Sequence, residues 1–351
     1  MRKLLTGLPS PGQLALPLVG VILIVVFTIL APSEFLTTGN FVAMFVSSAP
    51  TLVLALAVTT TLRSGDFDLS VSSNMIVCAA AVALLVQAHH WPLGSALAVG
   101  LSVGLGIGLV NSIIVVLWNL DGFISTLGTM TAVIGLGYAI TGGNVVYGLT
   151  GPLVSIERSK LFGIPLAVVY GWILAIILIY VFERTAVGRL WLFIGGNRDA
   201  ALLLGLPVRR LRIIAYLVGG LLSGVAGIIL AGSLGSVDVS SSGQYLLQPF
   251  VAAFLGTAAI KIGRFNILGT IVALYVLAIG ESGLVLLGAP VWISNVFDGL
   301  TLIVALAFSA VVQRRLFAAA KFHWLLTVLR HPVKPGVSEL VRDGSVTASR
   351  Q

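Results

Sequence analysis

Two carboxylates interrupt the apolar C-terminal part of the sequence. Glu281 lies in Ile279-Gly280-Glu281-Ser282-Gly283, and Asp298 lies early in the next apolar window. A charged group at membrane depth is costly, so each residue is a candidate for function. Glu281 could couple a proton or sodium ion to transport, or bind hydroxyl groups along a substrate path. It could equally reach water at the outer interface without any such role.

Uncharged polar side chains in the apolar windows form a second group of candidates. Each could contact a substrate or make a hydrogen bond between helices, and the sequence favours neither reading. The expected substrate pathway residues are Asn74, Asn111, Thr126, Gln248 and Glu281; Thr129, Tyr138 and Tyr275 are further polar positions.

Enzyme and metal motifs are missing from the sequence. The phosphate-binding P-loop ends in Gly-Lys-Ser/Thr, and the chain contains no Gly-Lys dipeptide. The four histidines comprise one adjacent pair and two residues near the C-terminus, and no His, Cys or carboxylate set has the spacing of metal ligands. We therefore expect no catalytic residues, no metal site and no cofactor, and hence a protein that is not an enzyme.

The composition indicates which kind of fold positions these residues. Of 351 residues, 58% are hydrophobic and 9% charged, against about 25% charged in a soluble domain. The mean hydropathy is +1.09. Forty glycines suit helices that pack closely in lipid, and the single Cys78 cannot form an internal disulfide. These values exclude a water-soluble fold and favour an all-α, polytopic membrane protein.

Uncharged windows of the length that crosses a bilayer mark the expected spans. A helix needs about 20 apolar residues to cross the hydrocarbon core. The longest window, 69–120, is divided at His89-His90-Trp91-Pro92, which is typical of an interfacial turn. The sequence predicts about ten helices, near 13–31, 41–62, 69–88, 93–118, 123–142, 164–182, 212–232, 245–260, 266–287 and 291–312.

The basic residues predict the orientation of these spans. With ten spans, eighteen of the twenty Lys and Arg residues fall on one side, and only Arg158 and Lys160 fall on the other. Basic residues collect on the cytoplasmic side of a membrane, so both termini are expected in the cytoplasm. The net charge of +8 thus reflects topology rather than binding to nucleic acid.

The two ends of the chain need separate interpretations. Arg2-Lys3 followed by an apolar run resembles a secretory signal, but the uncharged stretch of about 30 residues and the lack of a cleavage site favour a retained first helix. Residues 317–351 combine prolines with scattered charges, so they are expected to form a cytoplasmic tail. The predicted division is a transmembrane domain, 1–316, and this tail.

One cytoplasmic loop, 183–212, is longer than a simple connection requires. Residues 198–205 predict a short helix that begins after Asn197 as N-cap and ends at Gly205. Such a helix could dock onto a soluble partner. A basic loop that only fixes topology and contacts lipid headgroups explains the charges equally well.

Glycines at four-residue spacing indicate where helices approach closely. Gly100, Gly104 and Gly108 form one stripe, and Gly220 with Gly224 forms another. Such stripes favour close helix packing in membranes. The Gly104-Leu105-Gly106-Ile107-Gly108 run therefore needs no dinucleotide-binding interpretation.

Three motifs resemble the permease subunit of ATP-binding-cassette importers for simple sugars, the ribose, galactose, arabinose and autoinducer-2 group. The first is Ser64-Gly65-Asp66-Phe67-Asp68-Leu69-Ser70-Val71-Ser72-Ser73, and the second is Phe123-Ile124-Ser125-Thr126-Leu127-Gly128-Thr129-Met130. The third lies in the 183–212 loop and comprises Arg184-Thr185, Val187-Gly188-Arg189, Ile194-Gly195-Gly196-Asn197, Ala200 and Gly205. The similarity spans roughly residues 40–312.

The chain departs from the family pattern at a few positions. Asp66 and Ser72 stand where the family usually has glycine, and Glu281 stands where asparagine is common. Residues 256–264 replace a glycine-rich run of the family. These departures bear on the substrate rather than on the architecture.

The resemblance implies a function and a set of partners. Two permeases, identical or homologous, would form the channel in the bacterial inner membrane, two cytoplasmic ATPases would bind ATP, and a periplasmic protein would deliver a monosaccharide or related polyol. The 183–212 loop would couple the permease to the ATPase. The residues expected there are Gly195, Gly196, Asn197, Ala200 and Gly205 for shape, and Arg189 and Arg198 for docking charge.

Short matches suggest an inverted repeat of the second to fifth and seventh to tenth helices. Asp68-Leu69-Ser70 corresponds to Asp238-Val239-Ser240, and Asp121-Gly122 corresponds to Asp298-Gly299. Inverted repeats place transport sites near their interface. Two alternatives remain open: an ion-coupled secondary transporter that uses Glu281 and Asp298, and an importer permease for branched-chain amino acids.

Overall fold

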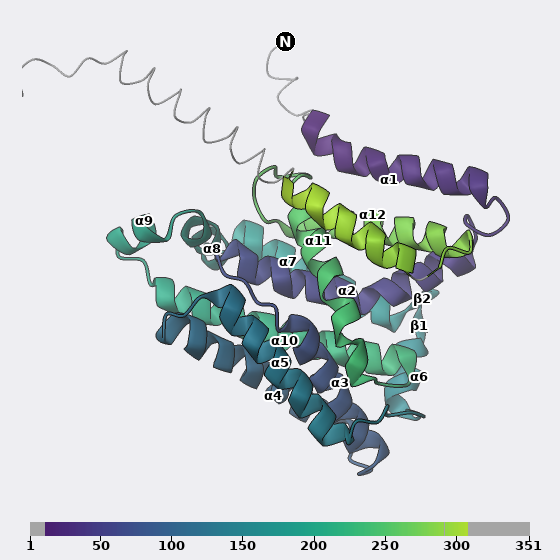
Figure 1. Cartoon of the computed structure of the whole chain (residues 1–351), viewed down its shortest axis with the longest axis horizontal. Helices are drawn as coiled ribbons and strands as arrows, with labels where there is room; N and C mark the ends of the chain where they lie inside the picture. The colour runs from purple at the N-terminus through teal and green to yellow at the C-terminus, as the bar shows by residue number, and fades with distance from the viewer. Residues whose placement is uncertain (1–10, 291, 308–351) are drawn as a thin grey trace, which may run out of the picture. The chain divides into compact units, whose positions relative to one another are not determined.

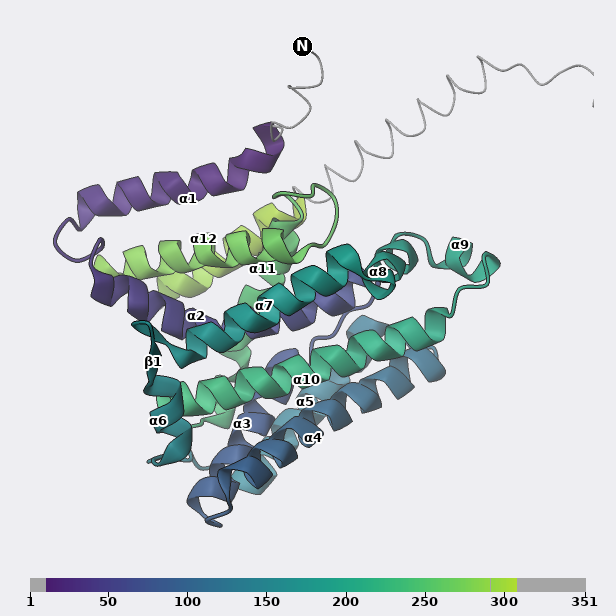
Figure 2. The ribbon, with the colours of Figure 1, turned by 180° about the vertical axis from the view of Figure 1, so that it is seen from behind.

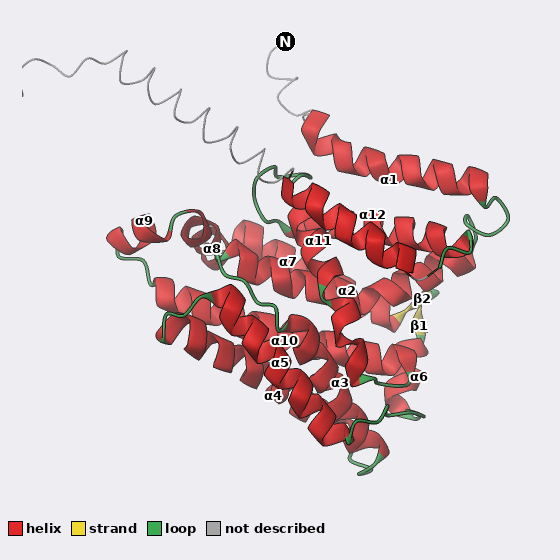
Figure 3. Cartoon of the chain, in the orientation of Figure 1, coloured by secondary structure: helices red, strands yellow, loops and turns green. Residues whose placement is uncertain are grey.

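The computed structural model describes residues 11–290 and 292–307, and its ordered elements are almost all helical (Figures 1 and 3). The N-terminal half contains α1 (Pro11–Leu30), α2 (Thr38–Arg63), α3 (Val71–Gln87), α4 (Leu93–Ser112), a π-helical turn η1 (Ile113–Leu117) and α5 (Gly122–Thr141). The rest contains α6 (Pro152–Arg158), α7 (Leu166–Arg184), α8 (Ala186–Gly196), α9 (Arg198–Leu203), α10 (Val208–Leu234), a 3-10 segment η2 (Val239–Tyr245), α11 (Leu247–Gly256), α12 (Ile267–Leu286) and a helix at Trp292–Ala307. The predicted all-α class is confirmed.

Seven of the described helices are long and apolar enough to cross a membrane: α1, α2, α4 continued through η1, α5, α7, α10 and α12. The other three predicted spans correspond to shorter helices. Those spans are 69–88, 245–260 and 291–312, and the structure has helices at Val71–Gln87, Leu247–Gly256 and Trp292–Ala307. The predicted span 291–312 extends beyond the described residues, as do the predicted domain end at 316 and the tail at 317–351.

The predicted interfacial turn at residues 89–92 is present. Helix α3 ends at Gln87, Pro92 precedes the first residue of α4, and His90 adopts a φ of 52°. Proline cannot donate the backbone hydrogen bond of a helix interior, but it is tolerated at a helix start, so the chain turns here. The 52-residue uncharged window therefore holds two helices rather than one.

The backbones of α4 and α10 pack closely against each other. A Cβ at Gly104 would lie 2.6 Å from the carbonyl oxygen of Gly220, and a Cβ at Gly220 would lie 2.4 Å from that of Gly104. Likewise, a Cβ at Gly108 would lie 2.5 Å from the carbonyl oxygen of Tyr216. The two predicted glycine stripes thus pack on each other, as small residues do in membrane helices.

Helix α2 is the most enclosed of the long spans. Every residue from 48 to 63 is buried, including Thr59, Thr60 and Thr61. The Thr60 hydroxyl donates a hydrogen bond to a carbonyl oxygen of its own helix. The Thr59 hydroxyl forms a hydrogen bond with the hydroxyl of Thr270 in α12 at 3.0 Å. Buried polar groups need such partners, particularly in a bilayer, where water cannot supply them.

Helix α1 lies along α12 at one edge of the bundle in both ribbon views (Figures 1 and 2). Phe27 packs directly on Gly283, where an added Cβ would meet the ring at 2.3 Å. Most of the rest of α1 is exposed, including Ile29 at 72%. Large exposed aliphatic side chains on a long helix are expected where lipid is the solvent.

The connection between α5 and α7 forms a small cap. Strands β1 (Lys160–Leu161) and β2 (Ile164–Pro165) make an antiparallel hairpin, and Val146 bridges Val237 after α10. Figures 1 and 2 both place α6 and this hairpin at one end of α10, with α8 and α9 at the other end. Arg158 and Lys160, the two basic residues predicted to be outside, lie in this cap.

Candidate functional site

The predicted 183–212 loop contains two helices. Asn197 accepts a hydrogen bond from the backbone N–H of Ala200 at 2.9 Å and so caps α9, and Gly205 adopts a φ of 70° just after the helix. The predicted short helix is therefore confirmed. Helix α8 was not predicted; it begins after Thr185, whose hydroxyl accepts from the Gly188 N–H at 3.3 Å. The signal was present in the sequence, since threonine is a preferred N-cap.

Close glycine contacts fix α8 against the membrane helices. A Cβ at Gly195 would lie 2.2 Å from the carbonyl oxygen of Arg63, and one at Gly188 would lie 2.5 Å from Cα of Phe182. Gly196, by contrast, has open space at its Cβ position. Gly195 and Gly196 were predicted to shape this segment together, whereas close packing requires a glycine only at Gly195.

Arg63, the last residue of α2, connects three separate segments. Its guanidinium donates to the carbonyl oxygens of Phe182 at 3.1 Å, Gly188 at 3.2 Å and Phe265 at 2.9 Å, and it stacks 4.4 Å from the centre of the Phe182 ring. A planar group with five donors suits this arrangement, and lysine could not reproduce it. Sequence reasoning used Arg63 only as a topology marker.

A second buried contact ties α8 to α10. The indole N–H of Trp191 donates to the carbonyl oxygen of Leu211 at 2.8 Å, and the Trp191 side chain is almost wholly buried. Arg189 lies on the exposed side of α8. Helix α9 instead presents apolar groups: Leu202, Leu203 and Leu204 are 55%, 89% and 68% exposed. Exposed leucines beside a set of basic residues are typical of a surface that another protein covers.

The C-terminal end of α2 and the N-terminal end of α10 meet at a buried carboxylate. Asp66 accepts two hydrogen bonds from Arg212, from Nε and from Nη2, each at 2.7 Å, and one from Arg198 Nη2 at 3.1 Å. Arg198 also donates to the carbonyl oxygen of Gly65 at 3.2 Å. The guanidinium of Arg198, predicted to supply docking charge, is therefore engaged inside the chain.

Two of the predicted pathway residues, Asn111 and Thr126, lie together at the start of α3, close to Asp68. Asn111 donates to Asp68 at 3.1 Å and to the Ser70 hydroxyl at 2.7 Å, and Thr126 accepts from the Leu69 N–H at 3.0 Å. Asp68 also accepts from the Ser70 N–H and hydroxyl. These hydrogen bonds hold the start of α3 against α4 and α5.

Asn74 makes its own bridge between helices. Its amide donates to the carbonyl oxygen of Gly104 at 3.2 Å, and it accepts from the Cys78 thiol at 3.2 Å. Asn74 therefore makes an interhelical hydrogen bond in this structure, and its contact with a substrate stays a prediction.

The remaining predicted residues form a separate cluster. Gln248 and Asp298 both lie close enough to Glu281 to interact electrostatically with its carboxyl group. Ser282 donates to Asn40 at 2.9 Å, and one carboxyl oxygen of Asp298 is buried without a hydrogen-bond partner. Four elements, α2, α11, α12 and helix 292–307, thus bring polar groups to one place.

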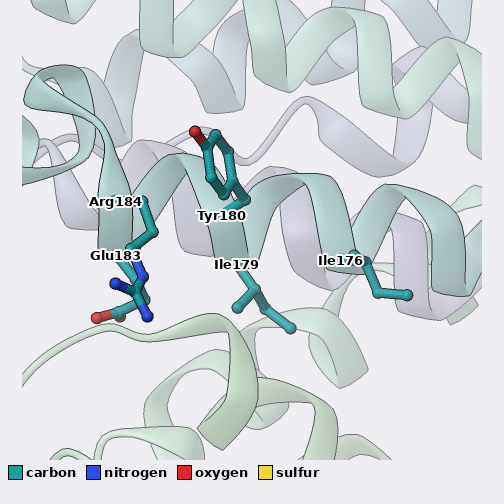
Figure 4. Close-up of a pocket in the computed structure, with 5 residues that line it drawn as sticks. All are labelled: Ile176, Ile179, Tyr180, Glu183 and Arg184. Carbon is teal, nitrogen blue, oxygen red and sulfur yellow. The ribbon is translucent and has the colours of Figure 1, made fainter.

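A surface pocket at the end of α7 offers no comparable site. Its volume is about 540 Å³, and it is lined by Ile176, Ile179, Tyr180, Glu183 and Arg184. Figure 4 shows Ile176 and Ile179 on one side of the helix and Tyr180 on the other, so the Tyr180 hydroxyl points away from the two isoleucines. Glu183 forms an ion pair with Lys261. Within residues 11–290 and 292–307, no three His, Cys, Asp or Glu side chains gather as metal ligands would.

Long apolar helices, close glycine packing and buried hydrogen bonds between helices define a polytopic α-helical membrane protein. Residues 40–306 match the family described as "Branched-chain amino acid transport system / permease component", and the chain belongs to this family. It is therefore a transport subunit rather than an enzyme. No solved structure gives a significant match.

Curated relatives resemble the chain over most of its length. The ribose import permease protein of Bacillus subtilis (strain 168) is 31% identical over 287 residues, which cover 81% of this chain and 88% of the relative. The D-allose transport system permease protein of Escherichia coli (strain K12) is 26% identical, covering 84% and 90%. The autoinducer 2 import system permease protein of Yersinia pestis is 29% identical, covering 78% of each chain.

Proposed function

We propose that the chain is the permease subunit of an ATP-binding-cassette importer that moves a monosaccharide or related polyol across a bacterial inner membrane. The observation that carries this proposal is the similarity, over at least 78% of the chain, to permeases named for ribose, D-allose and autoinducer 2. All three compounds are rich in hydroxyl groups. ATP would be hydrolysed by separate subunits, consistent with the absence of a P-loop from the sequence.

Ten spans with both termini in the cytoplasm remain the proposed topology. The seven long helices, α3, η2 with α11, and helix 292–307 would supply them. Support comes from α10, which has the basic α8–α9 segment at one end and the cap with Arg158 and Lys160 at the other (Figures 1 and 2). The transmembrane domain would end at 316, before a cytoplasmic tail, 317–351.

The proposed partners are two ATPase subunits, a second permease copy or homologue, and a periplasmic binding protein. Segment 183–212 would dock onto the ATPase. The exposed Leu203 offers an apolar contact that sequence reasoning did not identify. The proposed coupling residues are Arg189, Gly195, Gly196, Asn197, Arg198, Ala200 and Gly205, with Arg198 acting within the chain.

Asn74, Asn111, Thr126, Gln248 and Glu281 remain the proposed substrate pathway. The Gln248–Glu281 pair is the strongest part of this set, because its neighbouring amide and carboxyl groups could bind hydroxyl groups of a polyol. Asn74, Asn111 and Thr126 already make hydrogen bonds within the chain in this conformation, although the buried Oδ1 of Asn111 has no partner. Their bonded atoms would have to release these bonds to contact a substrate.

An inverted repeat of helices two to five and seven to ten is supported at one of its two matched positions. Asp68 accepts from the Ser70 N–H at 3.0 Å, and Asp238 accepts from the Ser240 N–H at 2.9 Å. Each turn precedes a shortened helix. The other match fails locally, because Asp121 caps the start of α5 whereas Asp298 lies inside helix 292–307.

Reconstitution distinguishes this function from its alternatives. The chain would be placed in liposomes with its ATPase and binding protein, using radiolabelled D-ribose, D-allose and L-leucine as probes. We expect sugar uptake that requires ATP and all partners. Uptake by the chain alone under a proton or sodium gradient would indicate an ion-coupled carrier. ATP-dependent uptake of leucine in place of the sugars would indicate an amino-acid permease.

Glu281→Gln tests the proposed substrate contact. The variant keeps the size and one hydrogen-bond acceptor but removes the charge, so we expect a KM for uptake that rises about ten-fold, the effect of losing one charge-assisted hydrogen bond. Complex assembly should be unchanged, as judged by co-purification. Unaltered uptake kinetics would make Glu281 an interfacial carboxylate without a role in transport.

A further inference from the structure

Asp66 joins two arginines that belong to different parts of the molecule. Arg212 lies on the central helix α10, and Arg198 is the first residue of α9 in the coupling segment. Asp66 and Arg212 are each 5% exposed, whereas the side chain of Arg198 is 38% exposed. The Asp66–Arg212 pair is therefore buried, whereas the Asp66–Arg198 pair is accessible at the surface.

The three charges are not equivalent in energy. A buried guanidinium needs its carboxylate, and the two-point Asp66–Arg212 contact satisfies it. The single bond to Arg198 at 3.1 Å is partly exposed and therefore much easier to break and remake. Movement of α9 can consequently change the Arg198 bond while the Asp66–Arg212 pair stays intact.

The chain around Asp66 continues directly into the polar cluster at the start of α3. The hydroxyl of Tyr216 in α10 donates to the Phe67 carbonyl oxygen at 2.9 Å, and Asp68 accepts from Asn111. The Gly65 backbone also lies against Gly195, since a Cβ at Gly65 would be 3.0 Å from Cα of Gly195. Residues 64–70 therefore touch the coupling segment on one side and α4 and α10 on the other.

Space exists beside this connection for it to move. A pocket of about 470 Å³ is lined by both arginines and by residues of two loops: Gly65, Asp66, Phe67, Asn119, Leu120, Asp121, Gly122, Phe123, Arg198 and Arg212. The α2–α3 connection is thus held by hydrogen bonds and an ion pair rather than by tight packing on every side.

We propose that Asp66 is a positioning residue for transport, which transmits displacement of α9 to the 64–70 connection and so to Asp68 and Asn111. The proposal rests on the proposed function, in which α9 contacts the ATPase.

Hydrogen exchange on the purified full-length chain tests the transmission without any partner. Arg198→Gln removes the accessible bond to Asp66, together with the bond to the Gly65 carbonyl oxygen, and leaves the buried Asp66–Arg212 pair. We expect amide exchange to accelerate about ten-fold in residues 67–70 as well as in α9, the effect of one lost charge-assisted hydrogen bond. Arg209→Gln removes the same charge from an exposed position on α10 and should change neither segment. Faster exchange in α9 with no change at 67–70 would overturn the proposal.

The assembled importer supplies a second readout, the number of D-ribose molecules transported per ATP hydrolysed. Arg198→Gln and Asp66→Gly should lower this ratio, and Arg198→Lys, which retains the charge, should restore it. A purely structural role would lower transport and ATP hydrolysis in proportion, leaving the ratio unchanged and contradicting the proposal. Absence of sugar uptake by the unmodified importer would count against the proposed function, while the exchange experiment would still decide the role of Asp66.

Discussion

At the residue scale, the adjacent glycines Gly195 and Gly196 have different structural roles. Gly195 lies against the carbonyl oxygen of Arg63, and Gly196 faces open space. A side chain is therefore excluded at one position and tolerated at the next. The close approach depends on how α8 lies against the end of α2, which is a tertiary contact and leaves no trace in the local sequence.

Gly195→Ala should separate α8 from α2, whereas Gly196→Ala serves as a matched control. The Cβ of alanine at 195 would stand 2.2 Å from a backbone oxygen, so we expect a destabilisation of about 1–3 kcal/mol, typical of overpacking. Thermal unfolding in detergent would measure it. Equal stability of the two variants would show that α8 can shift without cost.

Glu157 is a second residue with a measurable individual effect. Its side chain is buried in α6 against Gly232, one of its oxygens has no hydrogen-bond partner, and burial raises its pKa from 4.5 to about 7. The folded state thus binds a proton that the unfolded state releases above pH 4.5. Stability from this group is present at low pH and is lost as the pH rises toward 7.

Glu157→Gln should remove this dependence. The amide cannot ionise, so the melting temperature should rise by a few degrees at pH 8 and change little at pH 4.5. Melting curves of both proteins between pH 4.5 and 8 provide the measurement. A steeper loss of stability in the variant at high pH would mean that the ionised carboxylate is stabilising.

At the element scale, the connection between α7 and α10 consists of two helices with different surfaces. Helix α8 is fixed by Gly188, Gly195 and Trp191, whereas α9 exposes Leu202, Leu203 and Leu204. Helix α8 is thus held against the rest of the chain, and α9 extends from it with its leucines exposed. This arrangement suits an element that transmits movement from a partner protein.

Leu203→Asp should weaken association with the ATPase by about ten-fold or more, since a central apolar contact is replaced by a charge. Phe162→Asp in the hairpin loop is the control, because Phe162 is 96% exposed at the opposite end of α10. Co-purification of tagged ATPase would compare the two. Loss of association in both variants would place the docking surface elsewhere.

Sequence reasoning succeeded where the signal is local. Asn197 with Gly205, and the turn before Pro92, depend on the intrinsic preferences of a few neighbouring residues. It failed where partners are remote: Asp66 binds Arg198 and Arg212, which lie 132 and 146 residues later. The grouping of Gln248 with Glu281 likewise depends on the packing of α11 beside α12.

At the scale of the whole molecule, the proposed orientation can be tested with thiol labelling. The single Cys78 is fully buried, so the unmodified chain should not react with a membrane-impermeant maleimide. Ser159→Cys should react from outside intact cells, and Arg209→Cys only after the membrane is opened. Both positions are exposed, so accessibility within the protein does not limit either reaction. The reverse pattern would invert the topology.

The three hydrogen bonds of Arg63 also set an order of events during synthesis. Arg63 enters the membrane with α2, but its partner Phe265 is made 202 residues later. At typical translation rates this interval is about 10–40 s. For that time the third hydrogen bond of the guanidinium cannot form, so the end of α2 completes its contacts only when the segment before α12 has been made. Arg63→Leu should therefore alter the timing of assembly even where the finished protein is stable.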